Sequence, residues 1–267
     1  MNYWERLNNK LGAADDDMDA IGIIPARYGS TRFEGKVIQD LCGKPVIQHV
    51  YERAKKARLL DDLIIAADDD RIVEKVKAFG GKVVFTSKDH STGTDRLTEV
   101  VNQIDVRIIV NIQGDEPLIN PLVIDDLVRA MQSDDKIAMA TVVKKSYSIE
   151  EFKSPDVVKA ILNGQNEALY FSRSPIPTLL NPAPGGHFFY KHVGIYAYNK
   201  DFLFTFKKLP ESFLETHERL EQLRALESGY RIKAIETKFE TVGIDTPEDL
   251  ARAREILMES SERSVNA

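Results

Sequence analysis

This 267-residue chain has a single cysteine, Cys42, and a single tryptophan. One cysteine excludes a disulfide within the chain and a metal site made of cysteines alone, which fits a reducing compartment such as the cytoplasm. No run of about 18 apolar residues is present, so we expect no membrane-spanning helix. Residues 1–19 lack the apolar core of a signal peptide, and we expect them to form a polar N-terminal extension.

Positive charge is also in deficit, with 36 lysines and arginines against 42 aspartates and glutamates. The resulting net charge of −6 argues against general binding to nucleic acids or to membrane surfaces. An anionic substrate would therefore need a local cluster of cations or a bound metal ion. The content of 43% hydrophobic and 29% charged residues is ordinary for a globular protein.

Short apolar stretches alternate with stretches of helical spacing over the first half of the chain. The expected strands are 21–24, 63–67, 83–85, 108–112 and 137–143, and the expected helices are 46–60, 70–79, 95–103 and 120–131. This alternation predicts an α/β fold with a mainly parallel sheet and helices on both of its faces. We expect the first strand to stop at Pro25 and Asp70 to cap the helix that follows it.

The pattern becomes less regular after about residue 146. Further strands are expected at 157–162, 168–171 and 194–198, and helices at 214–228 and 247–258. A segment rich in proline and glycine, 174–186, precedes three adjacent aromatic residues, Phe188, Phe189 and Tyr190. Such a cluster is typical of an ordinary core, and a subunit interface is the alternative interpretation.

A loop with three cations follows the first expected strand. Its polar side chains are those of Arg27, Ser30, Thr31, Arg32 and Lys36. Several cations and hydrogen-bond donors must converge to neutralise a triphosphate, and open parallel sheets bind ligands at such strand-to-helix turns. The loop matches neither the P-loop nor the dinucleotide-binding pattern G-x-G-x-x-G, which argues against a dehydrogenase. It indicates a phosphate-binding loop, with a solvated basic turn as the alternative.

Two acidic turns are candidates for metal binding. Asp115 follows the expected strand 108–112 in the sequence QGDEP, and Asp245 lies in GIDTPEDL. One or two carboxylates together with phosphate oxygens are a typical environment for Mg²⁺. Gln113 can both donate to and accept from the edge of a base. An ordinary turn at Asp115 and a helix cap at Asp245 are the alternatives.

Four polar residues of the second half are candidates for binding a hydroxylated acid. They are Arg173, His192, Glu221 and Gln222. An arginine can bind a carboxylate through two hydrogen bonds, and the other three side chains can bond to hydroxyl groups. Taken singly, each has a structural role as its alternative.

Taken together, these motifs resemble those of the CMP-KDO synthetases, the 3-deoxy-manno-octulosonate (KDO) cytidylyltransferases, from about residue 21 to 257. The matching segments are IPARYGSTR, GKPVIQHVYERA, FGGKVVFTS, TGTDR, VNIQGDEP, ALYFSRSPIP, YKHVGIYAY, ERLEQLRALESGY and GIDTPEDL. The resemblance implies one domain of the nucleotide-diphospho-sugar transferase type over 20–258. A smaller subregion at about 146–230 would serve sugar binding and dimerisation, and 259–267 would be a tail.

The resemblance also implies a reaction and its site. CTP and KDO would give CMP-KDO and pyrophosphate with Mg²⁺, for lipopolysaccharide synthesis, in a cytoplasmic homodimer without nucleic-acid or membrane partners. The implied CTP site is Pro25, Ala26, Arg27, Ser30, Arg32, Lys36, Ala67, Asp68 and Gln113. The implied catalytic residues are Lys36, Arg27, Asp115 and Asp245, the last two as Mg²⁺ ligands. The implied sugar site is Arg173, His192, Tyr196, Glu221 and Gln222.

The chain departs from the family pattern in the first loop and near the base. Glu34 and Val37 stand where the family usually has prolines, so we expect a less rigid loop and an extra negative charge beside the cations. Ala67 stands where the family usually has threonine, so one hydroxyl near the base is missing.

Two alternatives to KDO cytidylyltransfer stay open. One is a related enzyme for another sugar acid, and the segments SRSPIP and LEQLRALE favour KDO over sialic acid but do not separate it from its 8-amino analogue. The other is a nucleotide-binding protein that kept the fold without the reaction. The presence of Lys36, Asp115 and Asp245 argues against that second alternative.

Overall fold

The computed structural model describes residues 18–30, 32–90, 92–178 and 188–265, with side chains up to residue 259. The chain divides into two compact units, 1–122 with 240–267 and 123–239. Thr31, residues 182–186 and most of the expected N-terminal extension lie outside the described residues. The boundaries of the domain at 20–258 and of its subregion stay predictions.

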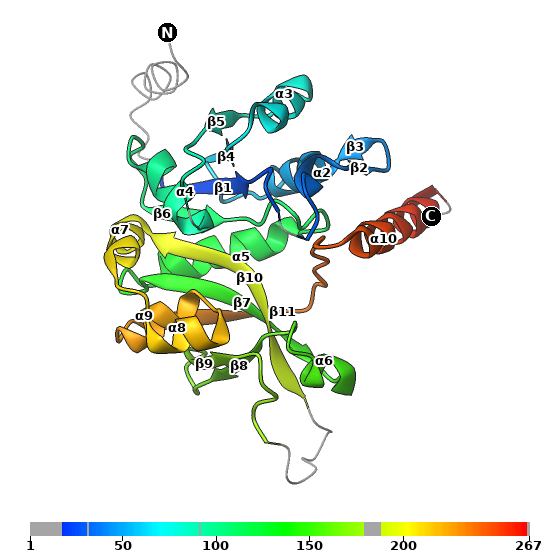
Figure 1. Cartoon of the computed structure of the whole chain (residues 1–267). Helices are drawn as coiled ribbons and strands as arrows, with labels where there is room; N and C mark the ends of the chain where they lie inside the picture. Colours follow the sequence, from blue (N-terminus) through cyan, green and yellow to red (C-terminus); the bar gives the residue numbers. More distant parts are fainter. Residues whose placement is uncertain (1–17, 31, 91, 179–187, 266–267) are drawn as a thin grey trace. The chain divides into compact units, whose positions relative to one another are not determined.

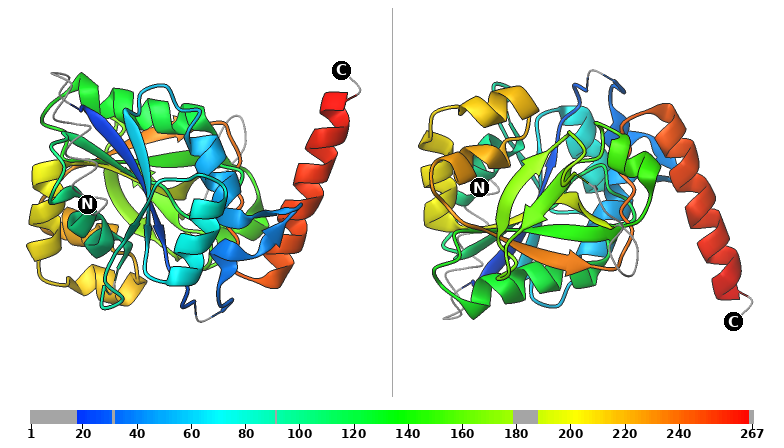
Figure 2. Two further views of the ribbon diagram at one scale, coloured as in Figure 1. Left: turned by 90° about the horizontal axis from the view of Figure 1, so that it is seen from above. Right: turned by 90° about the horizontal axis from the view of Figure 1, so that it is seen from below.

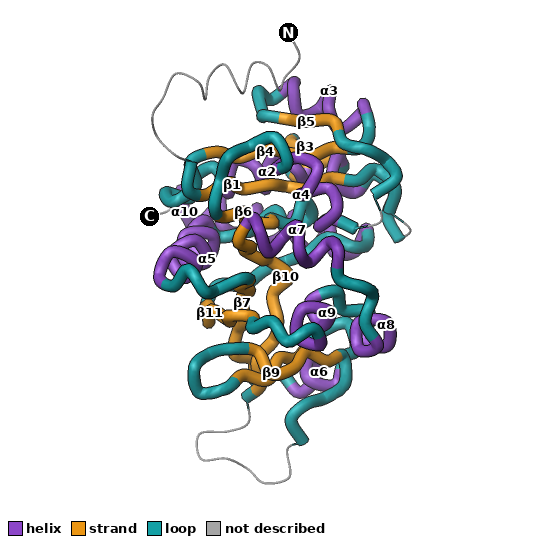
Figure 3. Tube along the Cα trace, turned by 90° about the vertical axis from the view of Figure 1, so that its left-hand side faces the viewer, coloured by secondary structure: helices purple, strands orange, loops and turns teal. Residues whose placement is uncertain are grey.

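The first unit is built on a parallel sheet with the strand order β6-β1-β4-β5 (Figures 1 and 3). Its strands are β1 (Ala20–Ala26), β4 (Asp62–Ala67), β5 (Val83–Phe85) and β6 (Ile108–Asn111). β1 pairs in parallel with both β4 and β6, and β4 pairs in parallel with β5. Nearly all side chains of β1, β4 and β6 are buried, which is typical of a sheet that is covered on both faces.

The helices between these strands explain the two covered faces. They are α2 (Val46–Ala54), α3 (Asp70–Ala78) and α4 (Gly93–Val101). The chain moves outward from β1 to β4 and β5, and α4 then returns it to β6 on the other side of β1. Because such crossovers are right-handed, this reversal places α4 on the opposite face from α2 and α3. The predicted α/β fold is confirmed, and its switch point lies between β1 and β6.

The sequence predicted that the first strand stops at Pro25, but β1 continues to Ala26. A proline has no N–H for a neighbouring strand. The pairing of β1 with β6 ends at Ile23, whereas Pro25 stays in register with β4. Alternate residues of a parallel strand bond to opposite neighbours, and the carbonyl of Ala26 accepts from the Asp68 N–H that follows β4. The missing N–H of Pro25 therefore faces the side on which β6 has already ended.

Two details of the predicted helices were wrong. α2 ends at Ala54 rather than at residue 60. Ala57 lies beyond the end of α2 and is buried. Its position continues the apolar spacing of the helix, and this spacing is why the sequence predicted a longer helix. The cap of α3 is Asp69 rather than Asp70, because the Asp69 side chain accepts from the N–H of Arg71. Asp70 is the first helical residue.

The last part of the first unit packs on the segment after β1. That segment holds the short helix η1 (Lys36–Ile38) and the hairpin β2 (Asp40–Leu41) and β3 (Lys44–Pro45), and α10 spans Pro247–Val265. Figure 2 shows α10 beginning beside this hairpin. A small core joins them, consisting of Leu41, Val46, Ile244 and Ala253 with Phe33, Val242, Leu250 and Leu257 packed against it. The cationic loop and the segment before Asp245 are therefore packed into one cluster.

The second unit is a mixed sheet. β7 (Met139–Ser146) lies between antiparallel β10 (Phe189–Asn199) and parallel β11 (Ile232–Thr237). β8 (Lys159–Leu162) and β9 (Ala168–Ser172) form an antiparallel pair, and β8 also pairs with β10. The helices are α5 (Pro121–Ser133, which starts in the first unit), α6 (Ile149–Lys153), α7 (Lys200–Lys208), α8 (Phe213–Glu218) and α9 (Gln222–Glu227).

The second unit differs from its sequence prediction in several elements. β10 begins at Phe189 rather than at residue 194, and α6, α7 and β11 were not expected. The expected helix 214–228 is two helices, because Arg219 adopts a left-handed conformation with φ of 53°. Phe189 is buried against Phe152, whereas Phe188 is 42% exposed. The core interpretation therefore holds for Phe189, and an interface role for Phe188 stays a prediction.

No helix in the described ranges is long and apolar enough to cross a membrane, as expected from the sequence.

Candidate active site

Lys36 lies between two carboxylates at the switch point of the first unit. Its Nζ is 2.5 Å from Oδ2 of Asp115 and 2.8 Å from Oδ1 of Asp245. The lysine side chain is only 14% exposed. Burial alone would lower the pKa of Lys36, but the two carboxylates raise it above its ordinary value. Lys36 is therefore a fixed positive charge flanked by two oxygen ligands.

Close backbone contacts bring these three residues together. Gly35 has a φ of 65°, which glycine adopts without strain, and its N–H donates to the carbonyl of Tyr28 at 2.8 Å. Gly114 approaches the end of β1 so closely that a Cβ there would lie 2.8 Å from the Pro25 carbonyl oxygen. The N–H of Ile244 donates to the carbonyl of Asp115 at 2.9 Å. The last contact fixes the two acidic turns to each other.

The two arginines of the first loop lie at different depths. Arg32 is exposed, and its Nη2 is 2.8 Å from Oδ2 of Asp245. Arg27 lies near the buried Arg96, whose pKa is lowered by burial, raised by Asp68 and lowered further by the charge of Arg27. The structure thus brings Arg32, Lys36, Asp115 and Asp245 into direct contact, and places Arg27 beside a second basic group.

Asp68 connects Arg96 to the first loop. One of its oxygens accepts from the N–H of Tyr28 at 3.0 Å, and the other accepts from Nη2 of Arg96 at 3.1 Å. Arg96 is fully buried on α4 and also donates to Thr86 Oγ1 and to the Ser87 carbonyl. Arg96 is not among the site residues predicted from the sequence, and an arginine within an amphipathic helix is usually exposed. In the structure it is the residue that fixes Asp68.

Arg71 braces the same loop from α3. Its guanidinium carbon lies 3.3 Å from the centre of the Tyr28 ring, and Asp69 accepts from its Nε at 2.7 Å and its Nη2 at 2.9 Å. These hydrogen bonds raise the pKa of Arg71, and the negative charge of Glu34 adds to the effect. The negative charge of Glu34 is therefore near a cation that contacts the loop through Tyr28.

A second group of predicted residues gathers on β10 in the second unit. Nε2 of His192 is 2.9 Å from Thr141 Oγ1, and the His192 and Tyr196 ring centres are 5.5 Å apart. Burial lowers the pKa of His192 to about 3, so the ring is neutral at physiological pH. Burial and the nearby charge of Glu221 raise the pKa of Tyr196, which keeps its hydroxyl protonated. His192 and Tyr196 therefore lie side by side on β10, and the charge of Glu221 acts on Tyr196.

Gln222 and Arg173 complete the predicted set. Gln222 is 4% exposed, and its Nε2 has no hydrogen-bond partner within the described part of the chain. A buried donor without a partner is costly, and a polar ligand would satisfy it. Arg173 donates from Nε to the Glu218 carbonyl at 2.8 Å and from Nη1 to the Pro155 carbonyl at 2.9 Å. These residues belong to the second unit, whereas the cationic loop belongs to the first.

The carboxylates of Asp115 and Asp245 fit a divalent metal ion. Both converge on one positive group, the ammonium of Lys36, which shows that a single cation can contact them together. Among the described residues there is no cluster of three or more metal-binding side chains. Two carboxylates are nevertheless the set that Mg²⁺ uses when phosphates supply further oxygens.

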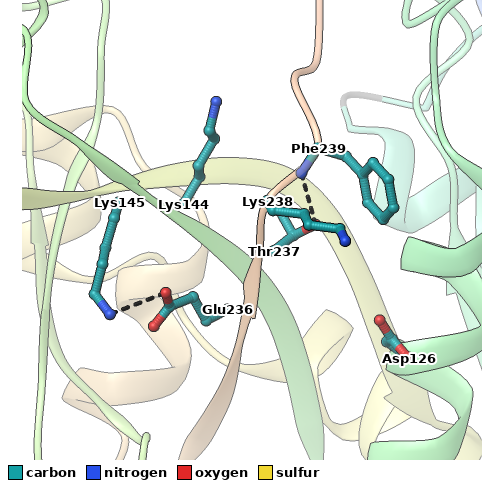
Figure 4. A pocket seen from close by; sticks show the side chains of 7 residues that line it. All are labelled: Asp126, Lys144, Lys145, Glu236, Thr237, Lys238 and Phe239. Atoms are coloured by element: carbon teal, nitrogen blue, oxygen red, sulfur yellow. Dashed lines mark hydrogen bonds and ion pairs between the residues drawn. The ribbon is translucent and has the colours of Figure 1, made fainter.

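A pocket of about 510 Å³ in the second unit is not part of either group (Figure 4). Its described lining is Asp126, Lys144, Lys145, Glu236, Thr237, Lys238 and Phe239. Lys145 pairs with Glu236 at 3.0 Å, and Thr237 Oγ1 accepts from the N–H of Phe239 at 3.2 Å. No predicted site residue is among these lining residues.

Comparisons with known proteins agree with this geometry. The family profile described as cytidylyltransferase matches residues 21–235. A relative from Geobacter sulfurreducens, named 3-deoxy-manno-octulosonate cytidylyltransferase, is 48% identical and covers 90% of this chain and 100% of its own. A relative of the same name from Geobacter metallireducens is 49% identical, with 90% and 98% covered.

One solved structure agrees with these relatives, and a second shares the fold alone. A CMP:2-keto-3-deoxy-manno-octonic acid synthetase complexed with CTP has a TM-score of 0.86 and 43% identity, covering 91% of this chain and 99% of its own. A 4-diphosphocytidyl-2C-methyl-D-erythritol synthase from Anaerococcus prevotii shares the fold at a TM-score of 0.60 and 15% identity, covering 91% of this chain and 97% of its own. The chain therefore belongs to the cytidylyltransferases and, among them, to the 3-deoxy-manno-octulosonate cytidylyltransferase family.

Proposed function

We propose that this protein transfers CMP from CTP to KDO, giving CMP-KDO and pyrophosphate for lipopolysaccharide synthesis. The observation that carries the proposal is the largely enclosed ammonium of Lys36, held by Asp115 and Asp245 at the switch point of a parallel sheet. Such a site combines a fixed positive charge with two carboxylates that can bind a metal ion. Two positive groups in one place suit the negative charge of a triphosphate. The names of the relatives and the CTP complex of the similar structure support the same substrates.

The first unit would bind CTP. Lys36, Arg32 and Arg27 would neutralise the phosphates. Gly35 and Gly114 allow the first loop and the turn before Asp115 to pack closely enough to bring Lys36 and Asp115 together. The nucleoside would contact the end of β1 at Pro25 and Ala26, the turn at Ala67 and Asp68, and the residues Ser30 and Gln113. Both carboxylate oxygens of Asp68 already accept protein donors, so its main effect would be to hold the Tyr28 backbone in place.

Asp115 and Asp245 would hold Mg²⁺. The ion would supply positive charge to the phosphates and orient them for in-line attack by the sugar hydroxyl. Lys36 would remain within reach of the same phosphates, because burial and two acidic neighbours fix its position. The chain would contribute mainly positioning and charge neutralisation, since transfer to the α-phosphorus needs no covalent intermediate on the protein.

The second unit would bind KDO. Arg173 would pair with the sugar carboxylate, and neutral His192 and protonated Tyr196 would hydrogen-bond the hydroxyls. Glu221 and Gln222 would add an acceptor and the donor that has no partner within the described residues. A single amino substituent changes few of these contacts, so the 8-amino analogue is the alternative substrate.

Pyrophosphate release tests the proposal. We expect purified protein with CTP and Mg²⁺ to release pyrophosphate when KDO is added, and not with CTP alone. Parallel reactions with sialic acid and 8-amino-KDO test the sugar. Release only with the amino analogue would keep the reaction and change the substrate. No release with any sugar acid, from protein that still binds CTP, would contradict cytidylyltransfer.

Replacing Arg71 with methionine should loosen the first loop without touching the substrate. The variant keeps an apolar contact on Tyr28 but loses the guanidinium that Asp69 and Glu34 face. We expect KM for CTP to rise about three- to tenfold, because ordering the loop would then be left to the substrate. Initial rates at varied CTP measure the effect. Arg129→Met, which removes an exposed ion pair with Asp126, is the control. An unchanged KM for CTP would show that Arg71 does not brace the loop.

A further inference from the structure

A buried cation lies beside Arg173, and no carboxylate of the described residues contacts it directly. Lys159 is 0% exposed, and its Nζ donates to the carbonyls of Ser154 at 2.8 Å, Val157 at 2.6 Å and Arg173 at 2.5 Å. Burial lowers the pKa of Lys159, although the charge of Glu218 opposes this. Burying an ammonium is costly unless hydrogen bonds compensate for the lost water. The three bonds to carbonyls provide this compensation, and they also hold the three backbone segments in place around Lys159. One of those carbonyls belongs to Arg173.

Glu218 holds Arg173 from the other side of its peptide unit. Its Oε2 accepts from the Arg173 N–H at 2.9 Å, and its Oε1 accepts from Ser172 Oγ at 2.6 Å and from the Tyr170 hydroxyl at 3.3 Å. Burial raises the pKa of Glu218, but these donors outweigh it and lower the pKa below its ordinary value. The ionised carboxylate thus ties the end of β9 to the end of α8.

The guanidinium of Arg173 is fixed as well. Nε and Nη1 donate to the carbonyls of Glu218 and Pro155, and Nη2 makes no hydrogen bond within the described part of the chain. The backbone turns sharply after Glu218, because Arg219 is left-handed, and it then enters α9 through Glu221 and Gln222. Glu218 therefore connects the strand end that carries Arg173 with the turn that carries two other predicted sugar-binding residues.

We propose that Glu218 and Lys159 are positioning residues of the sugar-acid site. They fix Arg173 so that Nη2 is presented to the substrate carboxylate, and they hold the turn before Glu221 and Gln222. This inference rests on the proposed function, because it assumes that Arg173 binds the acid. Neither residue touches the substrate. A purely structural role would lower stability and affect both substrates alike, whereas a positioning role acts on KDO alone.

Glu218→Gln tests the proposal with a matched control. The amide keeps the shape of the side chain but has one acceptor atom, so it cannot accept at both ends as the carboxylate does. We expect KM for KDO to rise about tenfold, because the variant loses a charged hydrogen-bond acceptor. KM for CTP should stay within about twofold of wild type. Glu167→Gln is the control, because Glu167 also accepts at both oxygens, from Arg231 and Asn163, at the opposite end of the β8–β9 hairpin. That variant should leave both KM values unchanged.

Several outcomes would overturn the inference. Equal increases in both KM values, or a lower melting temperature with both KM values unchanged, would reduce Glu218 to a structural residue. If Glu218→Gln does not fold, Ser172→Ala removes one donor to the same carboxylate, and it should raise KM for KDO about threefold and leave KM for CTP unchanged. An unchanged KM for KDO in that variant would also contradict the inference. Failure of the proposed function is distinguishable, because the wild-type protein would then form no CMP-KDO.

Discussion

Replacing Lys36 with methionine is expected to lower kcat for CMP-KDO formation by about 10²- to 10³-fold. Methionine has a similar length and no charge, so the variant removes the cation and keeps most of the volume. Lys36 is 14% exposed and bonded to two carboxylates, so water cannot easily replace its charge. A preorganised charge in a site with little water gives more stabilisation to a transition state than one in solution.

A matched lysine controls for the loss of a general ion pair. Lys44 pairs with Glu52 at 2.7 Å in the same unit, and its side chain is 44% exposed. Lys44→Met should leave kcat unchanged within about twofold, because exposed ion pairs contribute little. The steady-state rates of both variants, with their melting temperatures, give the comparison. A Lys36→Met variant that is folded and retains a third or more of the wild-type kcat would contradict the proposed role.

Replacing Asp115 or Asp245 with asparagine is expected to lower kcat/KM for CTP by about 10²- to 10³-fold. Each amide keeps the shape but removes one of the two negative charges that converge on Lys36. If these carboxylates hold Mg²⁺, the metal should no longer strengthen CTP binding in the variants. Calorimetry of CTP binding with and without Mg²⁺ measures this without any turnover.

The control for the carboxylate variants is Asp126→Asn. Asp126 pairs with Arg129 on α5 and its side chain is 43% exposed, so its loss should change neither the rate nor the Mg²⁺ dependence. Asparagine variants of Asp115 and Asp245 that keep the full Mg²⁺ dependence of CTP binding would exclude both residues as metal ligands. Asp245 would then be left with its alternative role, a residue in the cap region of α10.

The sheet of the first unit could be predicted from the sequence because its signals are local. The strands that include Ile23, Ile65 and Val110 are continuous apolar runs between helices of regular spacing, and this pattern is typical of a parallel sheet covered by helices. The same pattern placed Lys36 and Asp115 after the expected strands 21–24 and 108–112, and the structure shows that these two strands are neighbours. Asp245 could be recognised only by its motif, since nothing in the local pattern brings it back to Lys36.

The rest depends on contacts between distant segments. Arg96 and Lys159 are charged residues in an amphipathic helix and a short strand, and a pattern of spacing places such residues in solvent. Both are buried in the structure, where Arg96 donates to Asp68 and to the Ser87 carbonyl, and Lys159 donates to three backbone carbonyls that include that of Arg173. The break at Arg219 has the same origin. The residues around it have the spacing of one helix, and the contacts of Glu218 with β9 accompany the turn that ends the helix.

The distance along the chain between Lys36 and Asp245 has a consequence for synthesis on the ribosome. The two residues are 209 positions apart. A ribosome that adds about 5–20 residues per second makes the aspartate about 10–40 s after the lysine. Late in this interval the nascent chain contains every strand of the first sheet, but the cluster around Leu41 still lacks Ile244 and Ala253. A nascent chain that has not yet reached Ile244 therefore contains the strands of the sheet but lacks Asp245. We expect such a chain not to consume CTP.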